Sequence, residues 1–196
     1  MMKIYVLFIA LLLSGQINAE IRYADLQSQL GGDELLFISM ADAPNVLADA
    51  DSASHLRSYH NKFLREPLYD DYLHSLLTAM LGYNGFQHLF KNLGGGFVPV
   101  KVENDILIMK GTQDHCGGME EAIVLVDLNS GDLTSILYSQ ESFLIHSTYE
   151  TSEQLPQKGL LWIKRILDAY GTRTEPTRNK LLLRKMAGDW CQGYKK

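Results

Sequence analysis

Apolar residues recur at helical spacing in two long stretches, and each stretch predicts an amphipathic helix that packs on a core. The first follows Pro67, carries Asp70 and Asp71 in its first turns and stops at Gly82. The second ends at Gly171. The first apolar stripe comprises Leu68, Tyr72, Leu73, Leu76, Leu77, Met80 and Leu81, and the second comprises Leu160, Leu161, Ile163, Ile166, Leu167 and Tyr170. Shorter patterns predict helices over residues 52–65, 86–93 and 181–187.

Between the two long helices the apolar residues alternate with a period of two, which predicts β-strands. Short polar turns at 103–105 and 129–132 join four of these strands into two hairpins, so the sheet should be antiparallel. Pro99 has no N–H to donate to a ladder, and it therefore restricts the first strand to an edge or a bulge. The predicted strands cover residues 97–102, 106–110, 122–127, 133–138 and 143–149.

Helices, then hairpins, then helices predict an α+β fold, an antiparallel β-sheet of about five strands with helices packed on one face. The apolar run at 35–38 fits either a strand or a piece of buried helix. We expect three parts along the chain. They are a signal peptide at 1–19, an N-terminal extension at 20–66 and the α+β domain at 67–196.

The first residues have the layout of a secretory signal. A short positive start at Met1–Lys3 precedes an apolar run from Ile4 to Leu13 and a polar stretch that ends at Ala19. The apolar run is too short to span a bilayer. We therefore expect cleavage after Ala19, export of the mature chain and no membrane attachment once the signal is removed. An uncleaved N-terminal anchor is the alternative.

The composition is that of an ordinary globular protein, with 46% hydrophobic and 21% charged residues. Lys and Arg number 18 against 23 Asp and Glu, a net charge of −5. Cleavage of the signal removes one lysine and no acid, so the mature charge becomes −6. Phosphate neutralisation needs an excess of clustered cations, so this balance argues against nucleic acid as a partner and favours a cationic one.

Export changes the interpretation of the two cysteines. Cys116 and Cys191 both follow the cleavage site, and in an oxidising compartment one disulfide is the default expectation. Two cysteines without paired spacing do not form a zinc motif, and the chain has no phosphate-binding loop, so no metal and no cofactor are predicted. A thiol enzyme built on Cys116 and the neighbouring His115 stays open as an alternative.

Residues 110–119 join two predicted strands by a link longer than a tight hairpin needs. Glycines flank a compact polar centre, and loops held by a rigid scaffold commonly carry binding function. A bridge at the cysteine would reduce the entropy that the loop loses on docking. The candidate partner-binding residues are Thr112, Gln113, Asp114, His115 and Gly117. The alternative is a solvated connector whose cysteine staples the tail.

Several segments in order give the chain a family likeness. They are the helix before Phe90-Lys91-Asn92-Leu93-Gly94-Gly95, the hairpin at 97–109, Asp114-His115-Cys116-Gly117, the strand at 122–126 and Leu160-Leu161-Trp162. With these segments the stretch from Ser75 to Ile166 resembles the Ivy family. Members of that family are periplasmic inhibitors of vertebrate lysozyme that also act on some bacterial lytic transglycosylases.

The resemblance implies a mechanism for the loop. In the family the loop reads C-x-x-H-D-C, is closed on itself by its two cysteines and plugs the cleft of the muramidase, where the His meets the catalytic carboxylates. Here Gly111 stands in place of the first cysteine, and Asp114-His115 reverses the His-Asp order. The missing cysteine implies that Cys116 pairs with Cys191 instead. Matched by position, Asp114 takes the place of the family's His, so the assignment of the tip to His115 requires a shift of one residue. An imidazolium beside carboxylates has its charged form favoured.

The sequence thus predicts a periplasmic protein without catalysis of its own, which inhibits a lysozyme-like muramidase or lytic transglycosylase by inserting the 111–118 loop. Its acidic surface would steer it towards a basic enzyme. The resemblance also implies a homodimer, which the residues themselves do not predict. One alternative is an immunity protein against a periplasm-delivered cell-wall toxin, favoured by the unmatched segment at 20–66. Another is a cell-wall amidase that uses Cys116.

Overall fold

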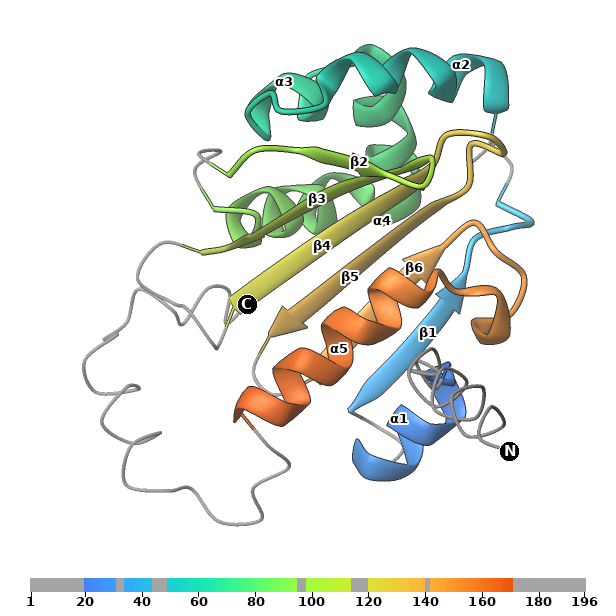
Figure 1. Ribbon diagram of the computed structural model, residues 1–196, viewed down its shortest axis with the longest axis vertical. Helices are drawn as coiled ribbons and strands as arrows, with labels where there is room; N and C mark the ends of the chain where they lie inside the picture. The colour runs from blue at the N-terminus through green and yellow to red at the C-terminus, as the bar shows by residue number, and fades with distance from the viewer. Residues whose placement is uncertain are drawn as a thin grey trace, which may run out of the picture.

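A six-stranded sheet with helices on both faces forms the centre of the molecule (Figure 1). The computed structural model describes residues 20–30, 34–43, 49–94, 98–113, 120–139 and 142–170. The predicted signal peptide at 1–19 and the predicted short helix at 181–187 lie outside these residues. The helices are α1 Tyr23–Leu30, α2 Ala50–Ser54, α3 Arg65–Leu68, α4 Asp71–Asn92 and α5 Gln157–Tyr170, with 3-10 turns at His55–Tyr59 and Ser152–Gln154. The strands are β1 Leu35–Ser39, β2 Lys101–Glu103, β3 Ile106–Thr112, β4 Glu120–Asp127, β5 Leu133–Ser139 and β6 Ser142–Ser147.

The strand order is β1-β6-β5-β4-β3-β2. The two predicted hairpins form as β2–β3 and β4–β5, and β6 adds antiparallel to β5, so the α+β prediction is confirmed. The strand count is six instead of five, because the run Leu35–Ser39 pairs in parallel with β6 from Leu35↔Phe143 to Ser39↔Ser147. A parallel strand at the edge of an otherwise antiparallel sheet makes the sheet mixed.

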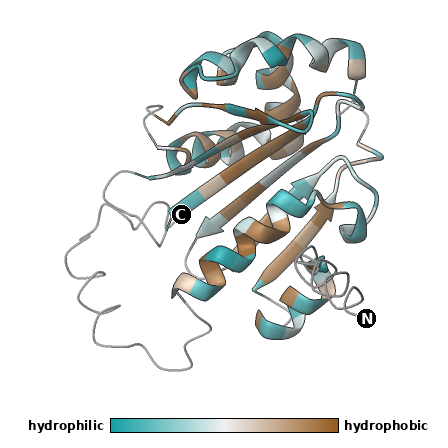
Figure 2. Ribbon diagram, viewed as in Figure 1, coloured by the Kyte–Doolittle hydropathy of each residue, from teal (hydrophilic) through white to brown (hydrophobic). Residues whose placement is uncertain are grey.

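Helices cover both faces of the sheet, and the prediction of helices on one face is wrong. On β4, Ala122 and Val124 pack in the cluster formed with α4, whereas Ile123 and Leu125 pack in the cluster formed with α5. Successive residues of a strand point to opposite faces, so a strand buried at every position requires cover on both sides. Figure 2 shows the hydrophobic residues concentrated in β4 and β5, between the two helical layers.

The longest helix, α4, begins at a capped aspartate. The Asp70 carboxylate accepts hydrogen bonds from the backbone N–H groups of Tyr72 and Leu73, which satisfies donors that the first helical turn leaves free. Gly82 has φ 68° and ψ 168°, so the helical backbone is interrupted there. The predicted stop at Gly82 and the predicted second helix beyond it are thus the two halves of one kinked element.

Residues before α2 are built into the same sheet as the later hairpins. The Tyr23 hydroxyl of α1 donates to the Leu35 carbonyl oxygen at 3.0 Å. The Gln157 side chain at the start of α5 bonds both backbone groups of Ile21, at 3.1 and 2.8 Å. The α1–β1 segment therefore extends the sheet by one strand and packs on the face that α5 covers.

Candidate functional site

The predicted partner-binding loop lies between β3 and β4. Thr112 is the last residue of β3, Gln113 follows it, and β4 resumes at Glu120. The predicted site residues Asp114, His115 and Gly117 lie outside the described residues, as do Cys116 and Cys191. The structure therefore defines the stem of this loop, which comprises residues 111–113 and 120–121.

Hydrogen bonds join the two sides of the stem at its last described residues. The Gln113 N–H donates to the Glu120 carbonyl oxygen at 3.0 Å, and the Thr112 hydroxyl donates to the same oxygen at 3.2 Å. One residue further in, Thr112 pairs with Glu121 in the β3–β4 ladder. The loop thus begins and ends on neighbouring, hydrogen-bonded positions.

The end of α4 packs against the first side of the stem through backbone alone. A Cβ added to Gly111 would overlap the carbonyl oxygen of Leu93, and a Cβ added to Gly94 would overlap that of Thr112. Gly94 also has φ 62°, a left-handed conformation that favours glycine. The structure therefore explains why glycine stands at residue 111. No side chain fits between the helix end and β3.

The second side of the stem begins with a buried carboxylate. Glu120 is only 4% exposed and lies on the face of the sheet that α4 covers. Its carboxylate accepts a hydrogen bond from the Ser139 hydroxyl at 2.7 Å and one from the Asn92 amide at 3.0 Å. His88 Nε2 lies 3.4 Å from the same oxygen that Asn92 contacts. Residues of α4, β4 and β5 therefore meet at this carboxylate.

The neighbouring acid, Glu121, points to the opposite face of the sheet and pairs with α5. Arg165 donates to its carboxylate at 2.9 Å. The Glu121 side chain is 9% exposed and the Arg165 side chain 57%, so the acid is buried whereas the cation remains partly in solvent. Consecutive acids at the start of β4 thus attach the stem to the helical layers on both faces.

Sequence reasoning located the loop but missed Glu120, Glu121 and Asn92. His88, which also lies at this carboxylate, has a side chain that is 33% exposed. The available signal was the pair Glu120-Glu121 directly before the apolar run of β4. Two acids entering a strand that is buried on both faces require partners on both faces.

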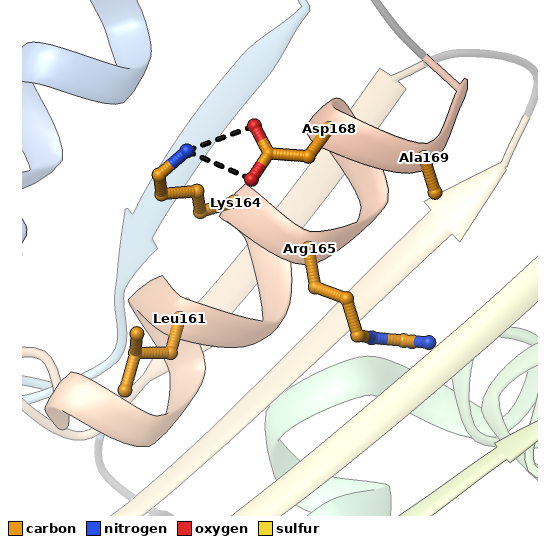
Figure 3. Close-up of a pocket in the computed structure, with 5 residues that line it drawn as sticks. All are labelled: Leu161, Lys164, Arg165, Asp168 and Ala169. Atoms are coloured by element: carbon orange, nitrogen blue, oxygen red, sulfur yellow. Dashed lines mark hydrogen bonds and ion pairs between the residues drawn. The ribbon is translucent and has the colours of Figure 1, made fainter.

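An open hollow along α5 shares Arg165 with this arrangement (Figure 3). Lys164 Nζ donates to both carboxylate oxygens of Asp168 at 2.8 Å, and Arg165 extends towards the sheet, where it meets Glu121. These charges already have partners, so the hollow offers no reactive group. Its lining consists of Leu161, Lys164, Arg165, Asp168 and Ala169.

The described part of the chain contains no group of three His, Cys, Asp or Glu side chains that could hold a metal ion. Within the same residues no helix has the length and apolar character needed to cross a membrane.

Comparison with known proteins assigns a family to this arrangement. A sequence model of the family "Inhibitor of vertebrate lysozyme (Ivy)" matches residues 73–169, which run from the first turn of α4 to the end of α5. The chain belongs to the Ivy family, as its resemblance predicted. No curated protein and no solved structure gives a significant match. Ivy proteins are inhibitors, so membership supports a general role as a lysozyme inhibitor and not as an enzyme.

Proposed function

We propose that the protein is exported to the periplasm and there inhibits a lysozyme-like muramidase or a lytic transglycosylase, with the 111–118 loop inserted into the enzyme's cleft. The observation that carries the proposal is the loop stem, which lies within the residues that the family model matches. Its two sides are joined by the Gln113 and Thr112 hydrogen bonds to Glu120. A loop presented on a fixed stem loses less conformational entropy on docking.

The chemistry of the loop suits an acidic cleft. Muramidase clefts present two carboxyl groups, one of which is protonated as the general acid. An imidazolium at His115 would donate to the ionised carboxylate and be favoured by its charge. A charged Asp114 would instead repel that carboxylate, so His115 is the proposed tip.

A lysis assay tests the proposal directly. The exported protein is mixed with a c-type lysozyme and, separately, with periplasmic lytic transglycosylases, and the clearing of a peptidoglycan suspension is followed. Dose-dependent slowing of at least one enzyme supports the proposal. Unchanged lysis by all of them would overturn it.

Two variants locate the tip within the same assay. His115→Ala should weaken inhibition strongly, because it removes the proposed cationic donor. Asp114→Asn should preserve or improve it, because it removes a charge that faces an acidic cleft. Asp168→Asn is the control for the second variant, since its carboxylate pairs with Lys164 on α5, outside the loop stem. Loss of inhibition by Asp114→Asn alone would transfer the role to that residue.

A second candidate is an immunity protein against a cell-wall toxin delivered to the periplasm. One observation favours it, because the family match begins at residue 73 while the preceding segment supplies β1 at the sheet edge. An additional edge strand is a surface on which a different partner could be recognised. Co-purification of one specific toxin, together with indifference to animal lysozyme, would select this function.

A further inference from the structure

The carboxylate of Glu120 lies on a face of β4 whose next inward-facing residues are apolar. It shares the α4 face of β4 with Ala122 and Val124, both fully buried. The Asn92 side chain that donates to it is also fully buried. Its carbonyl oxygen Oδ1 has no hydrogen-bond partner among the described residues.

Burial of the polar side chains of Glu120 and Asn92 costs more free energy than burial of apolar side chains would. Burial of a charged carboxylate is costly even when it is hydrogen-bonded, and well-packed apolar residues at such positions are commonly as stable or more stable. The unpaired Asn92 Oδ1 adds a further desolvation cost. Packing alone therefore does not explain a glutamate at residue 120. Hydrogen bonds that orient the loop stem would explain it.

This orienting role follows from where the donors originate. Asn92 and His88 come from the last two turns of α4, and Ser139 comes from the end of β5. Leu93, directly after the last residue of α4, lies against the other side of the stem through its contact with Gly111. The end of α4 thus contacts both sides of the loop stem, one through backbone and the other through Glu120.

We propose that Glu120 is the positioning residue of the inhibitory loop. Its carboxylate fixes the side of the stem at which the chain re-enters β4, and so sets the position of the Glu120 carbonyl oxygen that closes the loop. This inference rests on the proposed function for its consequence, which is affinity for the glycosidase. The anchoring itself can be measured without any partner.

The central variant is Glu120→Gln, matched by Glu103→Gln as control. The two substitutions make the same chemical change in one sheet, but Glu103 lies on β2, outside the loop stem, and pairs with Lys158 of α5. The glutamine side chain keeps one acceptor oxygen and replaces the other with a donor group, so Asn92 and Ser139 can no longer both donate to it. Glu120→Gln should weaken inhibition by about tenfold or more, and Glu103→Gln should change it by less than about threefold.

Amide hydrogen exchange separates anchoring from inhibition. The Gln113 N–H donates to the Glu120 carbonyl oxygen, so its exchange should accelerate in Glu120→Gln and remain near the wild-type rate in Glu103→Gln. If the wild-type protein inhibits no glycosidase, the proposed function fails while this exchange test still decides the anchoring. Equal acceleration in both variants, or none in Glu120→Gln, would overturn the positioning role.

A reciprocal exchange keeps the proposal testable if Glu120→Gln folds poorly. In the double variant Asn92→Asp with Glu120→Gln, the carboxylate and the amide change places across the same 3.0 Å contact. The double variant should recover both slow Gln113 exchange and inhibition relative to either single variant. A double variant that recovers the unfolding temperature but neither of these two properties would show a merely structural role.

Discussion

The α-carbon of Gly111 lies so close to the carbonyl oxygen of Leu93 that a β-carbon at residue 111 would overlap that oxygen. Gly111 does not have a left-handed backbone, so the requirement for glycine is steric and not conformational. Any movement of β3 away from the end of α4 would open a gap at this close contact and lose packing. The first side of the loop stem therefore meets the end of α4 through a close backbone contact, in addition to its hydrogen bonds with Glu120.

Gly111→Ala should lower the free energy of unfolding by about 2 kcal/mol or more, because the added methyl group overpacks a site bounded by backbone. Urea titration measures this loss. Gly85→Ala is the control, since its Cβ would meet only the Leu81 side chain at 3.0 Å and alanine gains helix propensity. Equal stability of Gly111→Ala and the wild type would contradict the backbone contact.

The position of the loop could be predicted from the sequence, but its support could not. Alternation in the two flanking strands and the glycines around a polar centre are local signals, and they located a link between two strands. The link is shorter than predicted, because β3 runs to Thr112 and includes residues 110–112. The contacts of Leu93 with Gly111 and of Asn92 with Glu120 join segments that only the fold brings together. Local patterns contain no information on such pairs.

Arg165→Ala should lower the free energy of unfolding by roughly 1–3 kcal/mol, because it leaves the buried Glu121 carboxylate without its donor. Lys164→Ala is the control on the same helix. It removes an exposed pair with Asp168 and should cost less than about 0.5 kcal/mol.

The same pair can be checked by a double-mutant cycle. Glu121→Gln combined with Arg165→Ala should recover part of the lost stability, because the unpaired charge is then absent. Strictly additive losses in thermal unfolding would mean that the ion pair contributes nothing.

The His146 side chain should make the free energy of unfolding depend on pH. It lies opposite Ser135 on neighbouring strands, and its Nδ1 has no hydrogen-bond partner among the described residues. Burial lowers the pKa of His146 below its ordinary value of 6.5. As the pH falls below that value, the unfolded chain takes up a proton before the folded one does, so stability decreases towards acid pH.

His146→Leu should therefore flatten the fall in stability below pH 6.5, since it removes this proton uptake. Urea titrations of both proteins at a series of pH values measure the two slopes. The difference between the slopes isolates His146 from the other histidines. Identical slopes would show that His146 is as easily protonated in the folded protein as in the unfolded chain.

The Asp70 carboxyl group should make the free energy of unfolding depend on pH in a second, more acidic range. Burial alone would raise the pKa of Asp70, but hydrogen bonds from His55, the Leu73 N–H and Tyr59 hold it below the ordinary 3.8. A carboxyl group with a lowered folded pKa stabilises the protein above its unfolded pKa, and this contribution is lost as the pH falls through the folded value.

Asp70→Asn should cost about 1 kcal/mol at neutral pH, because asparagine retains the helix cap but loses the charge-assisted bonds. The difference from the wild type should shrink as the pH falls below 3.8. Asp71→Asn, at the exposed next residue, is the control for the loss of one carboxylate in the first turn of α4. A constant difference at all pH values would contradict the lowered pKa.

Elements with a strong local period were predicted more reliably than those that depend on distant pairing. The α5 stripe and both hairpins appear where the pattern indicated. The run Leu35–Ser39 was ambiguous, because five apolar and small residues suit a buried strand or a helix, and only the ladder with β6 decides between them. The helices on both faces of the sheet also agree with the sequence of β4. Its apolar run is continuous, whereas a strand with one solvated face alternates apolar and polar residues.

The predicted disulfide gives the last test. Mass measurement of the intact exported protein, with and without reductant, should show a chain that begins at Glu20 and gains a pair of hydrogens on reduction. A bridge between Cys116 and Cys191 would close a long segment, so Cys116→Ser should lower the free energy of unfolding by about 4 kcal/mol while leaving the chain able to inhibit at low temperature. Free thiols in the exported protein, together with loss of a cell-wall amidase activity in Cys116→Ser, would instead identify the cysteine as a nucleophile.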